Sequence, residues 1–172
     1  EGGGTVAAIK TDGSLWMWGK NSCGVLGNGT TNDSFVPTKI MDGVKWVQTD
    51  DVLTAVIKKD NSLWMWGDNE YGQIGNGTSG DLVTVPFKVM DDVRTVCMNL
   101  YWAAAIKQDG SLWMWGNNMM GILYPTPRKT TTPYKVADNV KIGVGNFHTA
   151  TFIKEDDSLW RWGNNPGGLG LG

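Results

Sequence analysis

The hydrophobic pattern of the chain alternates with the period of a β-strand, and the same pattern occurs four times. Each occurrence begins with a β-rich stretch ending in Ile-Lys, and a second extended run follows after a polar pair. The stretches are Val6 to Lys10, Ala55 to Lys58, Ala104 to Lys107 and Thr151 to Lys154. The polar pairs are Asp12-Gly13, Asp60-Asn61, Asp109-Gly110 and Asp156-Asp157. Each set predicts a β-hairpin, because Asp-Gly and related pairs tolerate the positive φ angles of tight hairpin turns.

The second run of each hairpin is nearly identical in the four copies. Ser-Leu-Trp-Met-Trp-Gly starts at Ser14, Ser62 and Ser111, and Ser-Leu-Trp-Arg-Trp-Gly starts at Ser158. The leucines at positions 15, 63, 112 and 159 are 48, 49 and 47 residues apart. Successive strand residues point to opposite faces, so the two tryptophans share one face while Leu and Met share the other. Two apolar faces are typical of a sheet packed between two other sheets.

Two further strands are predicted in each unit. A glycine-rich loop follows the tryptophans, as in Gly24 to Thr30 and Gly72 to Thr78. A proline is then predicted to open a third strand, and a run of β-formers predicts a fourth. The third strands are expected at Pro37 to Ile40, Pro86 to Val89 and Pro133 to Val136, and the fourth at Val44 to Val47, Val93 to Cys97 and Val140 to Val144.

Four short antiparallel strands in a unit of this length predict an all-β fold of consecutive four-stranded blades of a β-propeller. We expect one array over residues 1–172, with units at about 1–49, 50–98, 99–145 and a partial unit at 146–172. The chain holds about three and a half units. We therefore expect it to belong to a longer chain or to self-associate, since open strand edges invite pairing.

The composition excludes several classes of function. The net charge is -2 and no block of basic residues is present, so nucleic acid is not an expected partner. No apolar run is long enough for a membrane span, and no signal peptide is recognisable. Cys23 and Cys97 stand at unrelated repeat positions, which indicates a loop thiol and a strand thiol rather than a disulfide.

The units resemble the repeats of the regulator-of-chromosome-condensation family. The resemblance rests on the Asp-Gly turn, the Trp-x-Trp-Gly strand and the Gly-x-Leu-Gly-x-Gly loop, most closely in Asp12 to Gly29 and Asp60 to Gly77. It implies a propeller, usually of seven blades. The glycine-rich form with Leu-Trp-Met-Trp-Gly is similar to bacterial members, including surface and secreted ones. Guanine-nucleotide exchange on a small GTPase and inhibition of an enzyme are activities that family members have.

The chain contains few side chains of the types that enzymes use for catalysis. His148 is the only histidine, and no nucleophile motif accompanies a serine, so we expect no enzyme activity and assign no catalytic residue. The cysteines and His148 contain no close-spaced ligand pair, so we expect no metal. Phosphate-binding loops end in Gly-Lys-Ser/Thr and are followed by a helix. The glycine-rich loops of this chain have neither feature, so we expect no cofactor.

The candidate binding residues are those that depart from the repeat, because there the structure does not dictate the residue type. Aromatic residues and arginine are also the types that anchor interfaces. The candidates are Tyr101, Trp102, Tyr124, Arg128, His148 and Arg161. Trp46, Tyr71 and Phe35 depart from the repeat as well. We expect a non-enzymatic scaffold that binds a protein partner. The alternative is recognition of carbohydrate or cell wall by exposed aromatic side chains.

Overall fold

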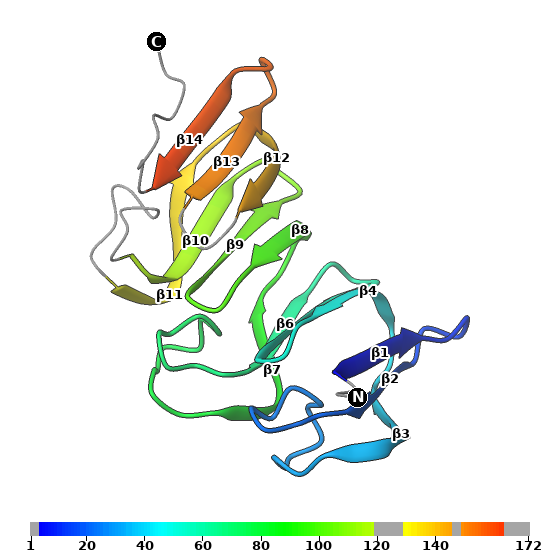
Figure 1. Cartoon of the computed structure of the whole chain (residues 1–172). Helices are drawn as coiled ribbons and strands as arrows, with labels where there is room; N and C mark the ends of the chain where they lie inside the picture. The colour runs from blue at the N-terminus through cyan, green and yellow to red at the C-terminus, as the bar shows by residue number, and fades with distance from the viewer. Residues whose placement is uncertain (1–3, 119–128, 146–148, 164–172) are drawn as a thin grey trace.

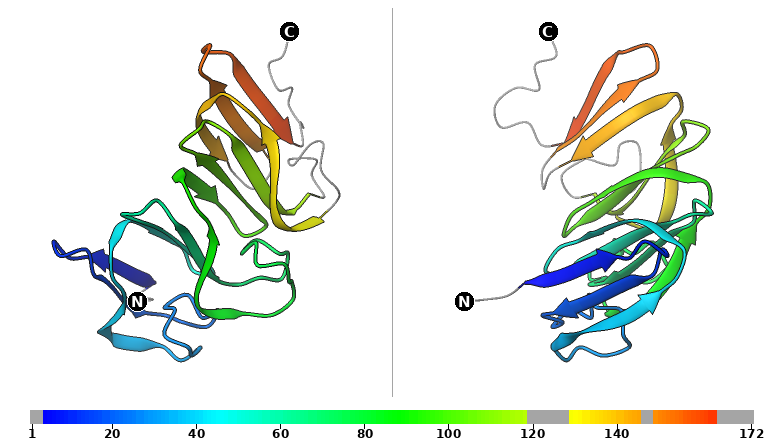
Figure 2. Two further views of the ribbon diagram at one scale, coloured as in Figure 1. Left: turned by 180° about the vertical axis from the view of Figure 1, so that it is seen from behind. Right: turned by 90° about the vertical axis from the view of Figure 1, so that its right-hand side faces the viewer.

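The computed structural model describes residues 4–118, 129–145 and 149–163, and these form fourteen β-strands in four antiparallel sheets (Figure 1). The first sheet has the strand order β1-β2-β3, the second β4-β5-β6-β7, the third β8-β9-β10-β11 and the fourth β12-β13-β14. The sheets follow one another in chain order, so that β1 and β14 belong to opposite ends of the array (Figure 2). In the described part of the chain, no helix is long and apolar enough to span a membrane.

The strand bounds are β1 Thr5–Ile9, β2 Leu15–Gly19, β3 Ser34–Met41, β4 Val44–Thr49, β5 Leu53–Lys58, β6 Leu63–Gly67, β7 Val83–Met90, β8 Val93–Met98, β9 Trp102–Lys107, β10 Leu112–Asn117, β11 Lys129–Ala137, β12 Val140–Gly145, β13 Thr149–Lys154 and β14 Leu159–Gly163. The fold class expected from the sequence, all-β with four-stranded antiparallel blades, is confirmed.

The sheets are displaced by one strand from the sequence units. The strand after each Pro-containing strand does not complete its own unit: β4 pairs with β5, and β8 pairs with β9. The second and third sheets therefore each begin with the last strand of one unit and take three strands from the next. A two-residue turn at Asp42-Gly43 and its equivalents carries the chain from one sheet to the next, so each covalent unit spans two blades.

The prolines do not open their strands, which corrects the sequence-based expectation. Pro37, Pro86 and Pro133 each lie inside a strand that starts three or four residues earlier. These strands lie at the edge of their sheets, and the pairing skips residues close to each proline, as between Met17 and Gly19 opposite β3. A residue without an N–H group is tolerated there because no ladder hydrogen bond is lost.

The two faces of each hairpin pack against different neighbours, as the alternation predicts. Leu63 and Met65 are fully buried against the third sheet, whereas Trp66 is fully buried against Leu15 and Met17 of the first sheet. Trp115 packs in turn against the second sheet. Each blade thus contributes aliphatic residues to the interface with the following blade and tryptophan to the interface with the preceding one.

The glycine-rich loop of one unit holds the second tryptophan of the next. The indole Nε1 of Trp66 donates to the carbonyl of Val25 at 2.7 Å, and Trp115 Nε1 donates to the carbonyl of Gln73 at 2.8 Å. Gly75 lies against this indole with φ of 81°, and a Cβ there would be 2.8 Å from Trp115 Nε1. Trp18, which has no preceding loop among the described residues, is only half-buried.

A buried asparagine shapes each of these two loops. The Asn21 side chain donates to the carbonyl of Thr30 at 2.9 Å and accepts from the N–H of Leu26 at 2.9 Å. Asn69, 48 positions later, makes the same bonds to Thr78 and Ile74. Both asparagines are fully buried. Sequence analysis did not single them out, although their spacing matches the repeat.

Each hairpin turn is built around an aspartate. In the second unit, Ser62 donates from its N–H and from its hydroxyl to the Asp60 carboxylate, at 3.0 and 2.6 Å. Trp64 Nε1 donates to the same serine hydroxyl at 2.9 Å. The other three units repeat this arrangement at Asp12, Asp109 and Asp156. These carboxylates therefore serve turn formation, as their repetition in the sequence indicates.

The loop–tryptophan contact can be tested with a pair of glycine variants. Gly75→Ala is expected to lower the free energy of unfolding by about 2–5 kcal/mol, from strained φ and overpacking together. Gly80 also has positive φ but has no atom within 4 Å of a Cβ placed there. Gly80→Ala is therefore expected to cost only about 1–2 kcal/mol. Equal losses in urea unfolding would contradict the proposed contact.

The turn aspartates predict a loss of stability in acid. Hydrogen bonds from the following serine hydroxyl and N–H lower the pKa of Asp12, Asp60, Asp109 and Asp156 below the ordinary value. Their contribution to stability is present above the unfolded-state pKa of about 4 and is lost as the pH falls through the lower folded-state value. Urea midpoints of Asp60→Asn should therefore fall less steeply below pH 4 than those of the wild type. Parallel curves would contradict this.

Candidate functional site

The structure separates the six candidate residues. Tyr124, Arg128 and His148 lie outside the described residues. Trp102 lies at the start of β9 with 1% of its surface exposed, within the core between the third and fourth sheets. Its ring is therefore not accessible to a partner in this structure. Arg161 lies on β14 opposite Thr151, at the position that Met17, Met65 and Met114 occupy in the other hairpins.

Tyr101 is brought together with an aromatic residue from another loop. It lies in the turn between β8 and β9, and its ring contacts Tyr71 of the glycine-rich loop after β6. The ring centroids are 5.1 Å apart with an interplanar angle of 66°, which is an edge-to-face contact. Both side chains are half-buried. The pair therefore spans the junction of the second and third sheets and remains accessible to solvent.

Gln73 links the two backbone segments that carry this tyrosine pair. Its side chain is fully buried; Oε1 accepts from the N–H of Tyr71 at 2.8 Å, and Nε2 donates to the carbonyl of Leu100 at 3.1 Å. One amide group thus connects the Tyr71 loop to the Tyr101 turn. Sequence analysis missed this residue. The signal available was that Gln73 replaces the apolar Val25 of the first unit, 48 positions earlier.

The tyrosine pair occupies positions at which the units differ. The equivalents of Tyr71 and Tyr101 at the preceding junction are Cys23 and Val52, both half-buried. The main-chain frame is the same at both junctions: Asn21 and Asn69 hold the two loops in the same way, and each loop accepts a tryptophan N–H. The backbone is therefore held in the same way at the two junctions, while the surface residues that it carries differ.

This end of the sheets, which we call the loop end, contains the loops at 20–33 and 68–82 and the turns at 50–52 and 99–101. It also includes Lys129 at the start of β11, which donates to the carbonyl of Glu70 at 3.3 Å. Acidic residues outnumber basic ones among the described residues of the loop end. The acidic residues of the loop end are Asp33, Asp50, Asp51, Asp68, Glu70 and Asp81, whereas its basic residues among those described are Lys20 and Lys129. The negative charge of Glu70, and then burial, raise the pKa of Tyr71. The phenol therefore stays protonated at neutral pH and can donate a hydrogen bond.

The opposite end of the sheets, the turn end, balances its charges locally. Lys39–Asp42, Lys88–Asp91 and Lys135–Asp138 form the same ion pair in three units, at 2.8, 2.8 and 2.7 Å. Their side chains are largely exposed, and such pairs contribute about 0–1 kcal/mol each. Because each lysine already has a carboxylate beside it, this end offers less uncompensated charge to a partner than the loop end.

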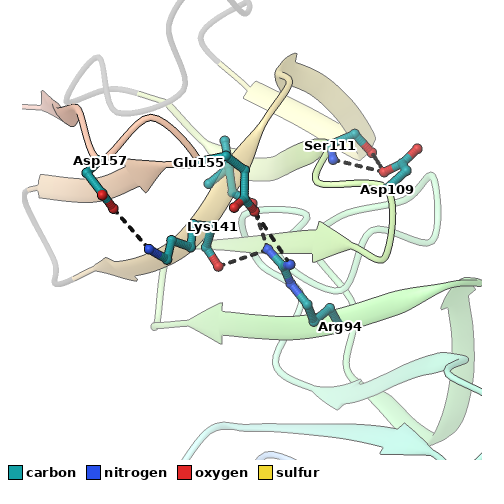
Figure 3. Close-up of polar contacts among 7 residues, drawn as sticks. Arg94, Asp109, Ser111, Lys141, Glu155 and Asp157 are labelled. Carbon is teal, nitrogen blue, oxygen red and sulfur yellow. Dashed lines mark hydrogen bonds and ion pairs between the residues drawn. The ribbon is translucent and has the colours of Figure 1, made fainter.

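Arg94 is a departure from the repeat that sequence analysis did not select. Lys45 and Lys141 stand at the same position and bond to Asn61 and Asp157 of their own sheets. The corresponding turn residue in the third sheet is Gly110, which has no side chain to accept a bond. Arg94 instead crosses to the fourth sheet, as Figure 3 shows, where Nη2 donates to the carbonyls of Val140 and Lys141 at 2.7 and 2.8 Å. The guanidinium also faces Glu155 at 3.9 Å.

The described residues contain no metal-binding or reactive cluster. No group of three His, Cys, Asp or Glu side chains among them could hold a metal ion. Cys23 and Cys97 are not joined by a disulfide. Burial raises the pKa of the Cys97 thiol to about 12, so it stays protonated and is a poor nucleophile.

The stacked four-stranded sheets define the class: these are consecutive blades of a β-propeller. Residues 12–49 and 60–98 each match the model of the regulator of chromosome condensation (RCC1) repeat. These two segments are therefore RCC1 repeats, in agreement with the resemblance that the sequence motifs carry. Among curated protein sequences, none matches the chain significantly.

Solved propellers share the fold at low sequence identity. Human WBSCR16 aligns with a TM-score of 0.78 and 20% identity over 96% of this chain and 46% of its own. Yeast RCC1 (Prp20), solved bound to Kap60, aligns with a TM-score of 0.79 and 21% identity over 95% of this chain and 42% of its own. The chain thus spans less than half the length of either protein, and these identities establish the fold alone.

The role of Gln73 can be tested by giving it the residue of the first unit. Gln73→Val leaves the Tyr71 N–H and the Leu100 carbonyl without their partner, so we expect a loss of about 1–3 kcal/mol in urea unfolding. Gln108→Ala is the control, because Gln108 is exposed and its bond to the Val93 carbonyl is long, at 3.4 Å. That variant should change stability by less than about 0.5 kcal/mol. If the two losses are similar, Gln73 does not connect the loops as described.

Proposed function

We propose that this chain is a non-enzymatic protein-interaction scaffold, and that its binding surface is the loop end centred on Tyr71 and Tyr101. The observation that carries the proposal is the edge-to-face tyrosine pair, held by buried Gln73 at a position where the units differ. A partner gains most from side chains that are already ordered, because little conformational entropy is lost on binding. Tyrosine combines apolar contact area with a polar tip and is enriched at binding hot spots.

The charge of the loop end indicates the kind of partner. With six acidic residues against two basic ones among the described residues of the loop end, a segment rich in Lys or Arg is complementary. Arginine can also stack on an exposed tyrosine ring. The yeast protein Prp20p, which shares the fold, was studied for its binding to Gsp1p and histones, and another structure shows it with Kap60. These relatives support a protein as the class of partner for this chain.

Carbohydrate recognition is the second candidate function, because the half-buried tyrosine pair remains accessible to solvent. Sugars stack flat on an aromatic face, whereas in an edge-to-face pair one ring lies against the face of the other. The geometry therefore favours a protein partner. Guanine-nucleotide exchange and enzyme inhibition are forms of the same scaffold function and depend on which protein is bound.

A peptide library displayed on phage tests the proposal without a known partner. Peptides selected on the intact protein should be rich in Lys and Arg, and their affinity should fall as salt rises. The double variant Tyr71→Ala/Tyr101→Ala should weaken the selected peptides by about tenfold or more. Tyr134→Ala is the matched control, because Tyr134 is 45% exposed but lies on the outer strand β11. The Tyr134→Ala variant should bind the selected peptides with the same affinity as the wild type.

Three results would contradict the proposal. The first is selection of peptides without basic residues, and the second is equal loss of affinity in the Tyr134 control. The third is saturable binding of oligosaccharides that is lost in the double tyrosine variant, which would favour the carbohydrate alternative.

A further inference from the structure

The contact between Tyr71 and Tyr101 joins two tyrosines from different sheets. Tyr71 belongs to the loop after β6 of the second sheet, and Tyr101 belongs to the turn before β9 of the third. Their ring centroids are 5.1 Å apart, and no other two tyrosine rings among the described residues are in contact. A phenol that loses one electron and one proton becomes a radical, and two such radicals join through their ring carbons when they meet. The pair therefore has the contact that oxidative coupling of tyrosine requires.

Hydrogen bonds to the backbone hold both tyrosines in place. The N–H of Tyr71 donates to Gln73 Oε1 at 2.8 Å, and the N–H of Tyr101 donates to Asn99 Oδ1 at 2.8 Å. Both accepting side chains are buried, and Gln73 Nε2 also donates to the carbonyl of Leu100 at 3.1 Å. Two groups that are held together react as if each were present at a high concentration. The half-buried rings can still reorient quickly, so their ring carbons can come into bonding contact.

Glu70 provides an acceptor for a phenol proton. Its charge is the largest cause that raises the pKa of Tyr71, followed by burial, the charge of Tyr101 and a hydrogen bond between Tyr71 and Glu70. Because the phenol keeps its proton at neutral pH, oxidation must remove a proton together with the electron. The carboxylate beside the phenol can take that proton. The contribution of Tyr101 indicates that the two phenol groups lie near each other as well as the rings.

We propose that Tyr71 and Tyr101 form a site of oxidative cross-linking, at which a one-electron oxidant joins the two rings as dityrosine. Each phenol gives one electron to the oxidant and one proton to Glu70 or to water. The two tyrosyl radicals form one C–C bond between the ring carbons next to those that bear the oxygens. The hydrogen atom on each joined carbon then moves to the oxygen of its own ring, which restores both aromatic systems. The protein loses two hydrogen atoms, and the oxidant gains two electrons.

The cross-link ties the second sheet to the third at the loop end. The two tyrosines are 30 positions apart, and the segment between them contains β7 and β8. A covalent bond across this segment restricts the unfolded chain, as a disulfide does. The equivalent positions at the preceding junction are Cys23 and Val52, which cannot form this bond. The cross-link requires only the contact between the rings, so it is independent of what binds to the loop end.

The test exposes the intact, dilute protein to a photo-oxidised ruthenium tris-bipyridine complex, with persulfate as the final electron acceptor. We expect dityrosine fluorescence in a product that contains a single chain, with an intact mass two hydrogen atoms below that of the untreated protein. Digestion should release a linked pair of peptides that contain positions 71 and 101. The linked fraction should not depend on protein concentration, because the reaction is intramolecular. The urea midpoint of the cross-linked protein should be higher than that of the untreated protein.

Phenylalanine variants identify the two rings that react. Tyr71→Phe and Tyr101→Phe each keep an aromatic ring but lack the phenol, so each should abolish the linked product. Tyr134→Phe is the matched control, because Tyr134 is 45% exposed on the outer strand β11, and it should leave the yield unchanged. Gln73→Val should lower the yield several-fold, because the backbones of both tyrosines lose a hydrogen bond that holds them together. Circular dichroism checks that each variant is folded.

The proposal is overturned if no linked peptides with positions 71 and 101 are found at an oxidant dose that modifies Tyr134. It is also overturned if the bond forms only between chains, maps to other tyrosines, or persists in Tyr71→Phe. An unchanged urea midpoint in the cross-linked protein would contradict a covalent tie between the two sheets. The selection of basic peptides uses the protein without oxidant, so failure of the proposed scaffold function and failure of the cross-link are distinguishable.

Discussion

The stacking of the sheets depends on the hydrogen bonds that Trp66 and Trp115, the second tryptophans of their hairpins, donate to a carbonyl in the glycine-rich loop of the preceding unit. A buried indole N–H needs an acceptor, and the loop provides one only if its backbone comes within about 3 Å of the ring. Glycine at positions such as Gly75 permits that approach. The loop itself is held by Asn69 from within. Tryptophan, glycine and asparagine thus act together, although they belong to different parts of two successive units.

The two ends of the sheets differ in how far their side chains vary from unit to unit. At the turn end, the Asp–Ser–Trp bonds and the Lys–Asp pairs repeat with little variation, so the residue types there are set by local structure. At the loop end, the backbone is equally constant, but the side chains that it presents differ between Cys23 and Tyr71 and between Val52 and Tyr101. Surface residues that the fold does not constrain can vary with the partner. The binding surface that we propose is centred on the tyrosine pair for this reason.

Arg94 and the edge of β14 show how departures from the repeat alter the contacts between sheets. The hairpin turn of the third sheet has Gly110 where the second and fourth sheets have Asn61 and Asp157. Arg94 on β8 therefore bonds to the fourth sheet instead of to its own (Figure 3). On β14, Leu159 keeps the residue type of the repeat but is 61% exposed, and among the described residues β14 pairs only with β13. At Arg94 a change of residue type adds hydrogen bonds between the third and fourth sheets. At Leu159 the residue type is unchanged and the surroundings differ.

The sequence alone determined the hairpins, the alternation of Leu and Met against Trp, and the role of the turn aspartates, because these follow from neighbours in the chain and from the two-residue period of a strand. Only the tertiary structure showed that the sheets are displaced by one strand from the units. The sequence pattern does not determine whether β4 pairs with β3 of its own unit or with β5 of the next. It also placed Trp102 in the core and Tyr71 beside Tyr101, 30 positions away. Repetition in a sequence fixes what each unit is, whereas burial and contact between units depend on how the units stack.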